Sequence, residues 1–429
     1  MKILCTGDLH IGRFPTRLPA DAPRRSLAVS ERWSAIVDLA IAERIDVVAL
    51  SGDLVDRANR FFEAYGPLES GVRRLAEAGI TIVAVAGNHD FDVLPPLAEN
   101  VASDRFHLIG RGGRWERTRV SSANGERLDV HGWSFPTERV STDPLHGYDL
   151  EPDGALPTLG LLHCDLNASS SSYAPVSAAA LRSRPPGLWL LGHLHDPRLH
   201  HAAGAADLLY PGSPQPLDPG EAGAHGVWVV ETRGSDFGEP RFVPVATVRY
   251  EARDVDVAGL TTIDAVKARV VDQVEALREG VLLESGTQPE YLSIRLRLTG
   301  RTPLGARLVE REIVADAGDL DIGGQVRCAV DRVTVDTQPA LDLDDLARAA
   351  DAPGTLAALL VALRDGTDDE VTRALLTRTR EAAEQVGAAS AYLPLRARAT
   401  ASRPTETADV LRAQASLLLE ELVGQKGSG

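Results

Sequence analysis

Cysteine is scarce in this chain of 429 residues. The three cysteines, Cys5, Cys164 and Cys328, are isolated, and an odd number without a repeated spacing argues against a disulfide framework and fits a reducing cytosol. Cys5 and Cys164 adjoin polar motifs, but their apolar surroundings predict buried strand residues rather than thiolate metal ligands.

Long apolar runs are also missing. No run reaches the roughly 20 residues that span a bilayer, and the N-terminus enters a strand-like segment at residues 2–6 without a signal-peptide layout. We therefore expect a cytoplasmic protein that does not enter a membrane.

Lysine is nearly absent, so almost all the basic charge is arginine. The formal net charge of −16 argues against a protein that binds along nucleic acid by overall electrostatic attraction. It does not exclude an enzyme that binds phosphate through metal ions. Arginine suits bidentate phosphate contacts, but a GC-rich genome is the better default explanation of its abundance.

The first half of the chain alternates strands and helices. Apolar runs predict strands at 2–6, 46–51 and 80–86, and helical spacing predicts helices at 27–44 and 61–78, which implies neighbouring parallel strands. A hairpin around Asn124-Gly125 and further strands follow, and together they predict a mixed sheet or two packed sheets flanked by helices. The ranges expected are 115–120 and 127–134 for the hairpin, then strands at 159–162, 188–191, 208–210 and 226–231.

The second half changes composition near residue 245. We predict a first domain at 1–245, a small α+β domain at 246–338 and a helical region at 339–429. The elements expected in the small domain are strands at 248–257, 291–298 and 326–335 and helices at 262–279 and 304–315. Those expected in the last region are helices at 343–350, 354–364, 367–387 and 405–423, with a gap at 394–404.

Five polar clusters follow apolar runs in the first domain, and they contain the most informative residues of the chain. The clusters are Gly7-Asp8-Leu9-His10, Gly52-Asp53, Gly87-Asn88-His89-Asp90, His163, and Gly192-His193-Leu194-His195. One such cluster alone is more often an ordinary turn. Five in order, each at the end of a strand, predict one shared metal site.

The ligand types define the metals that would fit. Asp8 and His10 are two residues apart, so in extended geometry they point to the same side, and the Asp53 carboxylate has two oxygens that can bridge two ions. With Asn88, His163, His193 and His195 the set is mixed nitrogen and oxygen, which favours Mn²⁺, Fe or Zn²⁺. Other histidines lack this context, and we expect structural or surface roles for His107, His131, His146, His200, His201 and His225.

These motifs resemble the signature of calcineurin-like metallophosphoesterases across residues 7–195. The resemblance implies a β-sandwich flanked by helices and two divalent metal ions, and it makes His89 the acid that protonates the leaving oxygen, with Asp90 orienting it. The reaction implied is attack on phosphorus by a hydroxide held between the ions. The implied ligands are Asp8, His10, Asp53 and His195 for one ion, and Asp53, Asn88, His163 and His193 for the other.

Flanking residues narrow the resemblance to SbcD-type DNA repair exonucleases and their YhaO-like branch. The segments that carry it are Gly7–Arg13, Leu161–His163 with Tyr173-Ala174-Pro175, and Trp189–His195 with Leu209–Ser213. The resemblance makes the first domain a nuclease domain and the small α+β domain a capping domain. Archaeal and eukaryotic relatives usually carry a histidine where this chain has Asp56, so the balance of exonuclease and endonuclease activity stays open.

The resemblance also implies DNA, a second copy of the chain and an SbcC-like coiled-coil ATPase as partners, near the nucleoid. Arginines beside the first two motifs are candidate DNA phosphate contacts, with an ordinary solvated loop as the alternative. These arginines are Arg13, Arg17, Arg57 and Arg60, with Arg24 and Arg25 in the same loop as Arg13. The C-terminal helices either close their own domain or bind the coiled coil of the ATPase.

Three functions are compatible with the sequence. A Mn²⁺-dependent DNA nuclease is favoured by the flanking motifs and by the chain beyond the catalytic domain. A small-molecule phosphodiesterase or nucleotidase of the same fold is favoured by the acidic charge. A DNA-end scaffold without catalysis is disfavoured because every ligand position is filled.

Overall fold

The computed structural model describes residues 1–18, 22–56, 64–101, 103–168, 170–284, 288–304, 308, 326–367, 369–388 and 404–427. The chain divides into two compact units. One comprises Met1–Asp254, Lys267–Arg297 and Glu310–Thr334, and the other comprises Val255–Val266, Leu298–Val309 and Val335–Gly429. The domain borders expected near residues 245 and 338 stay predictions.

The first sheet of the larger unit carries the predicted β-α-β-α-β order. Strand β1 pairs in parallel with β2, and β2 pairs in parallel with β3, as expected. The strand order is β14-β13-β1-β2-β3-β4, with β15 on β13. The strands are β1 Lys2–Thr6, β2 Val47–Leu50, β3 Thr81–Ala84, β4 Phe106–Leu108, β13 Gly226–Arg233, β14 Asp236–Phe237 and β15 Arg241–Pro244; the helices are α1 Val29–Ala42, α2 Tyr65–Glu77 and α3 Leu94–Val101.

The second sheet of the same unit has the order β11-β12-β10-β7-β6-β5. The predicted hairpin is confirmed, since β5 and β6 pair antiparallel around the turn at Gly125, whose φ is +81°. The strands are β5 Glu116–Ser121, β6 Arg127–Trp133, β7 Thr158–His163, β10 Leu188–Gly192, β11 Arg198–His200 and β12 Asp207–Tyr210; smaller elements are the 3₁₀ turn η2 Pro144–Gly147, β8 Asp165–Leu166, β9 Pro175–Val176 and α4 Ala178–Arg182.

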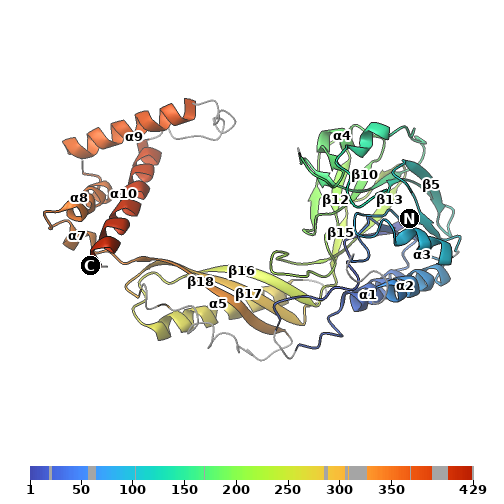
Figure 1. Cartoon of the computed structure of the whole chain (residues 1–429), viewed down its shortest axis with the longest axis horizontal. Coiled ribbons are helices and arrows are strands. Elements are labelled where there is room, and N and C mark those ends of the chain that lie inside the picture. Colours follow the sequence, from blue (N-terminus) through green and yellow to red (C-terminus); the bar gives the residue numbers. More distant parts are fainter. Residues whose placement is uncertain are drawn as a thin grey trace. The chain divides into compact units, whose positions relative to one another are not determined.

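Alternating side chains build the larger unit in layers (Figure 1). In β1, Ile3 and Cys5 point between the two sheets, while Leu4 packs on the opposite face with the side chains of α1 and α2. In β10, Leu190 lies between the sheets and Trp189 packs on the outer face. Both faces of each central strand are therefore buried, which explains their continuous apolar runs. The predicted sandwich of two sheets flanked by helices is confirmed.

Three longer strands and one helix follow. The three-stranded sheet has the order β16-β17-β18, and its strands overlap the three ranges predicted for the small domain to within one residue at their predicted starts. The elements are β16 Val248–Asp256, α5 Ile263–Leu283, β17 Tyr291–Thr302 and β18 Arg327–Pro339. The helix expected at 304–315 falls almost entirely outside the described residues.

The smaller unit contains the helices predicted near the C-terminus, α7 Leu343–Leu346, α8 Ala352–Asp365, α9 Glu370–Ala388 and α10 Pro404–Gly427. The Asp351 side chain caps α8 by accepting from the N–H of Gly354, and Leu360 of α8 packs with Leu419 of α10 in a small core. The expected gap at 394–404 lies outside the described residues, apart from its last residue. None of the helices described is both long and apolar enough to cross a membrane.

Candidate metal centre

All seven predicted metal ligands lie at or just beyond the carboxyl ends of strands from both sheets. The first sheet supplies Asp8 and His10 after β1, Asp53 after β2 and Asn88 after β3. The second sheet supplies His163 at the end of β7, and His193 and His195 after β10. Side-chain contacts between the two sets of ligands join them into one site.

The backbone around these ligands is left-handed, which differs from the extended geometry expected for Asp8 and His10. Their φ angles are +48° and +51°, and those of Asp53 and His193 are +52° and +98°. Backbone hydrogen bonds hold the turn, with the N–H of Asp8 donating to Gly52 O and that of His10 to Asp53 O. Such strained residues persist only where neighbouring structure fixes them, and they gather at functional sites.

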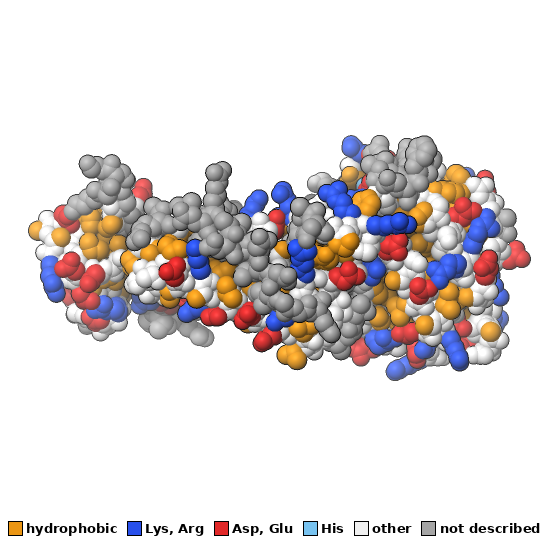
Figure 2. Space-filling view, turned by 90° about the horizontal axis from the view of Figure 1, so that it is seen from below, with side chains coloured by type: hydrophobic (Ala, Val, Ile, Leu, Met, Phe, Trp, Pro, Cys, Tyr) orange, Lys and Arg blue, Asp and Glu red, His pale blue; other side chains and the backbone are white. Residues whose placement is uncertain are grey.

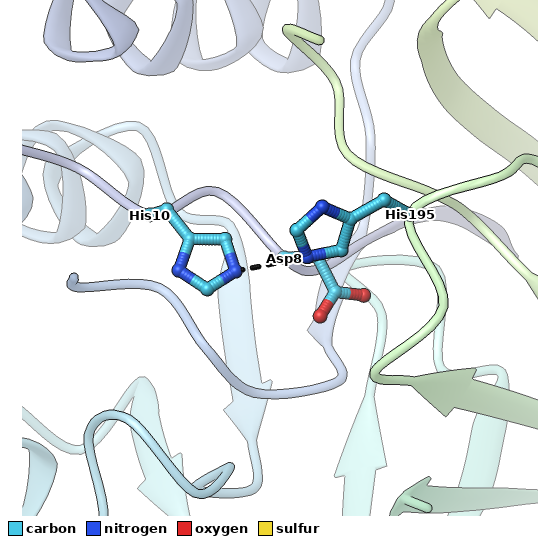
Figure 3. A group of neighbouring side chains, drawn as sticks. All are labelled: Asp8, His10 and His195. Atoms are coloured by element: carbon cyan, nitrogen blue, oxygen red, sulfur yellow. Dashed lines mark hydrogen bonds between the residues drawn. The ribbon is translucent and has the colours of Figure 1, made fainter. Parts of the chain in front are cut away.

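Asp8, His10 and His195 form one candidate metal group, whose ligand atoms all lie within 4.8 Å of one another. His10 Nε2 is 3.1 Å from His195 Nε2, and the Asp8 carboxylate is beside this pair (Figure 3). Two imidazole nitrogens at this distance need a shared proton or cation between them. Asp53 Oδ2 is 4.0 Å from His10 Nε2, which is close enough for Asp53 to serve as a fourth ligand of the same ion.

Asp8, Asp53 and His163 form a second candidate metal group. His163 Nε2 lies 3.3 Å from Asp53 Oδ2 and 3.0 Å from Asn88 Oδ1, so three predicted ligands of the second ion converge. The ring of His193 packs against that of His163, with centroids 5.4 Å apart. Asp53 therefore lies close to both groups, where a bridging carboxylate would be.

Burial and close charges shift the protonation of this centre. Burial raises the pKa of Asp8. Burial also opposes ionisation of Asp53, but the charge and hydrogen bond of His163 outweigh it and hold the pKa of Asp53 well below its usual range. Burial lowers the pKa of His163, yet Asp53 and Asp8 raise it to about 9 in the metal-free chain. The anionic Asp53 thus favours positive charge beside it.

The donor set fits divalent ions. The described residues offer imidazole nitrogens, carboxylate oxygens and one amide oxygen, and the nearby cysteines, Cys5 and Cys164, are buried thiols whose pKa is raised to about 12 by burial. His10 Nδ1 is buried without a hydrogen-bond partner among these residues. Nitrogen and oxygen ligands without thiolate suit Mn²⁺, Fe or Zn²⁺. The division of ligands between two ions stays a prediction.

His10, Asp56 and His89 form a third candidate metal group, at the edge of the other two. The His89 ring meets that of His10 edge-on, with centroids 4.8 Å apart, and the backbone N–H of His89 donates to Asp53 Oδ1 at 2.8 Å. Burial lowers the pKa of His89. A half-buried imidazole in this position could exchange a proton with a substrate bound at this centre.

Asp90, expected to orient His89, is engaged elsewhere. Its carboxylate accepts from the backbone N–H groups of Leu54 at 2.6 Å and Gly87 at 2.8 Å, and burial raises its pKa to about 7. The carboxylate of Asp56 lies near the His89 ring, with Oδ1 3.8 Å from Nδ1. The orienting role of Asp90 stays a prediction, and Asp56 is the alternative that the contacts favour.

Glu221 is a residue of this site that sequence reasoning missed. Its Oε1 lies 3.0 Å from His195 Nδ1, and its Oε2 accepts from Ser213 Oγ at 2.8 Å and from Leu217 N at 3.1 Å. Glu221 lies within the long loop between β12 and β13, away from the end of either strand, and no motif surrounds it. Only the fold shows that this loop reaches the metal centre.

Two glycines allow the ligands to approach the backbone closely. A Cβ on Gly87 would lie 2.2 Å from Asp53 Oδ1, and one on Gly192 would lie 2.5 Å from His163 Nδ1. No side chain fits at either place without displacing a ligand. The glycines in these motifs therefore make room for the neighbouring carboxylate and imidazole.

The predicted phosphate-contacting arginines are only partly placed. Arg13 Nε lies 3.9 Å from Asp56 Oδ1, beside the metal centre, and the Arg17 side chain is exposed. Arg57 and Arg60 lie outside the described residues. The histidines expected to be structural join none of the candidate metal groups found among the described residues; these are His107, His131, His146, His200, His201 and His225.

Two family models match the chain. Residues 1–197 match the model described as calcineurin-like phosphoesterase, and residues 250–338 match the middle domain of metallophosphoesterase YhaO. The predicted family resemblance is thereby confirmed for the part of the chain that carries the five clusters.

Three curated proteins illustrate the relatives. An uncharacterized metallophosphoesterase YhaO of Bacillus subtilis is 28% identical over 270 residues, 60% of this chain and 64% of that protein. The DNA double-strand break repair protein Mre11 of Methanopyrus kandleri is 25% identical over 368 residues, 80% of each chain. A component of the nuclease SbcCD of Rhodobacter capsulatus is 25% identical over 293 residues, 57% of this chain and 69% of that protein. The match thus spans just under two thirds of the Bacillus protein.

Proposed function

We propose, from the premise that residues 1–197 form a calcineurin-like metallophosphoesterase domain, that this hydrolase of phosphoester bonds is a two-metal DNA phosphodiesterase of double-strand-break repair. The observation that carries the two-metal part is the position of Asp53. Its Oδ2 lies 3.3 Å from His163 Nε2 and 4.0 Å from His10 Nε2, between the two candidate ligand groups.

Asp8, His10, Asp53 and His195 would hold one divalent ion, and Asp53, Asn88, His163 and His193 the other. When bound, such ions polarise a phosphate and lower the pKa of a nearby water. Mn²⁺ is our first choice, with Fe and Zn²⁺ as alternatives.

His89 would protonate the leaving oxygen. Its ring meets that of His10 edge-on, with centroids 4.8 Å apart, so the imidazole stands beside the predicted ligands, where a general acid would act. Asp56 would steady the ring through the 3.8 Å contact between Oδ1 and Nδ1.

DNA is proposed as the substrate because of the relatives. The Mre11 and SbcCD proteins are named for break repair and for nuclease activity, and the Mre11 match covers 80% of this chain. Figure 2 shows basic and acidic side chains interspersed on the face in view, so DNA would bind through local contacts. Arg13 and Arg17, with Arg57 and Arg60, would supply such contacts.

A direct comparison of substrates tests this proposal. With Mn²⁺, the wild-type protein should hydrolyse a linear duplex, and Asp53→Asn should abolish that activity. Hydrolysis of a cyclic nucleotide without any cleavage of blunt, overhanging or hairpin DNA would instead favour the small-molecule phosphodiesterase. Binding of DNA ends without hydrolysis under any of the three metals would favour the inactive scaffold.

The helical region would bind an SbcC-like coiled-coil ATPase, and the protein would act as a homodimer at the nucleoid of the cytoplasm. Leu419 packs in the helical core, whereas the neighbouring Leu417 and Leu418 are 54% and 47% exposed. Since exposed leucines contribute little to folding, Leu417→Ser with Leu418→Ser should prevent co-purification with the ATPase and spare phosphodiesterase activity. Unchanged co-purification would show that these helices only close their own domain and do not bind the ATPase.

A further inference from the structure

Beside the metal centre, the loop after β1 and the start of α1 line a cavity of about 470 Å³. The lining residues that matter here are Gly12, Arg13, Phe14, Arg24, Arg25 and Glu31. The backbone N–H of Arg13 donates to His10 O at 3.1 Å, and Gly12, the first residue lining the cavity, stands two residues after this predicted metal ligand. Arg13 Nε also lies 3.9 Å from Asp56 Oδ1, so the cavity adjoins the loop that carries the first two predicted ligands.

The charge of the cavity favours an anion. Arg13, Arg24 and Arg25 face one acid, Glu31. Within the described part of the chain, no hydrogen bond or ion pair engages the side chains of Arg24 and Arg25, and both are exposed. Unengaged guanidinium groups can make bidentate contacts with phosphate without first breaking an internal pair.

Phe14 gives the cavity an aromatic wall. It is 40% exposed and is one of the few large apolar side chains that the described structure leaves in solvent. Arginines close to an exposed aromatic ring are the combination that holds single-stranded nucleic acid, because every base can stack on the ring whatever its identity.

We propose that this cavity binds the nucleotide next to the scissile phosphate on an unpaired strand. Phe14 stacks on its base, and Arg24 and Arg25 contact the phosphate beyond it. The inference rests on the proposed DNA phosphodiesterase function. It adds that the protein engages a frayed or overhanging end rather than an intact duplex, and does so without regard to sequence.

Binding can be measured apart from catalysis. Fluorescence anisotropy of a labelled oligothymidylate in EDTA should show weaker binding for Phe14→Ala, by roughly the 5- to 100-fold range of one lost base–aromatic stack. Arg24→Ala with Arg25→Ala should also weaken binding and reduce its salt dependence. Phe14→Tyr should bind like wild type. Arg127→Ala is the charge control, because Arg127 begins β6 at the strand end opposite the metal centre.

An abasic substrate identifies the stack itself. Removing one base should weaken binding by the wild-type protein. It should not weaken binding by Phe14→Ala any further, because that variant has already lost the stack. Equal affinity of wild type and both variants, or a blunt duplex that competes as well as the single strand, would overturn the inference.

The metal centre is followed separately with bis(4-nitrophenyl) phosphate, which lacks a neighbouring nucleotide. All cavity variants should hydrolyse this ester at the wild-type rate with Mn²⁺. If wild type hydrolyses neither ester nor DNA, the proposed function fails, while the anisotropy result still decides whether the cavity binds a nucleotide.

Discussion

Glu221 fixes His195 from the side away from the metal centre, with Oε1 3.0 Å from Nδ1. This contact keeps the proton on Nδ1 and turns Nε2 toward His10 Nε2. Burial alone lowers the pKa of His195, but Glu221 raises it, and His195 in return lowers the pKa of Glu221. Ser213 and Leu217 hold the other carboxylate oxygen, so the whole loop supports one imidazole.

Replacing Glu221 should weaken metal binding. Partners of this kind typically contribute 10- to 100-fold to metal affinity. We expect Glu221→Gln to lower Mn²⁺ affinity by about 10-fold and Glu221→Ala by more, as measured by isothermal titration calorimetry on the metal-free protein. Glu239→Gln, which changes an exposed carboxylate, is the control. Wild-type affinity in both Glu221 variants would show that the contact does not position the ligand.

Replacing His89 should separate catalysis from metal binding. In His89→Asn, kcat should fall by about 10²- to 10⁴-fold, the usual contribution of a general acid, because the leaving oxygen has no proton donor. Metal content and Mn²⁺ affinity should remain at wild-type values, since His89 is not a predicted ligand. Retained turnover in a metal-loaded variant would remove the acid role from His89.

Two glycines of α2 should respond in opposite directions to alanine. A Cβ on Gly71 would lie 2.1 Å from Trp33 Nε1, so Gly71→Ala overpacks the interface of α1 and α2 and should cost about 1–3 kcal/mol. A Cβ on Gly66 meets nothing within 4 Å, and Gly66→Ala should stabilise the helix by up to about 1 kcal/mol. Urea unfolding of both variants checks the difference, and equal midpoints would contradict it.

His131 should make stability depend on pH. It is fully buried with Tyr148 Oη 2.6 Å from its Nδ1, and burial lowers its pKa from 6.5 to about 4. Below pH 6.5, His131 therefore becomes protonated in the unfolded chain, whereas in the folded chain it becomes protonated only near pH 4. The free energy of unfolding falls as the pH drops from 6.5 to about 4.

The shift corresponds to about 2 kcal/mol lost at pH 5, at roughly 1.4 kcal/mol per pKa unit. His131→Gln cannot take the proton, so its unfolding free energy in urea should fall by about 2 kcal/mol less than that of wild type between pH 7 and pH 5. The variant shares every other titrating group, which makes the difference specific. Parallel losses in the two proteins would place the pH dependence elsewhere.

The sequence predicted the elements that have a strong pattern. Residues 81–84 and 188–192 are buried on both faces and read as strands, and ligands at strand ends were foreseeable because parallel strands end at one edge. The backbone conformation of Asp8 was not foreseeable, since the turn depends on Gly52 O, far along the chain. Partners of this kind become visible only when distant segments meet.

The same reason explains Glu221 and Asp90. Glu221 contacts His195, which is 26 residues away in the sequence. It lies in a loop without periodicity, so no local pattern marks it. Asp90 stands next to His89 in sequence, and that proximity suggested a pair. In the fold it instead ties Leu54 to Gly87, which links the turns after β2 and β3.

The left-handed backbone of the centre restricts which amino acids can replace its ligands. Asp8, His10, Asp53 and His193 all have positive φ, and aspartate, asparagine and histidine are the side chains that best tolerate it apart from glycine. A variant meant to trap substrate should therefore be Asp8→Asn or Asp53→Asn. Glutamate in either place keeps the charge but suits the turn less well, so a nominally conservative exchange would be the more disruptive one. At these positions the set of tolerated residues is chosen by the chain's geometry as well as by the metal.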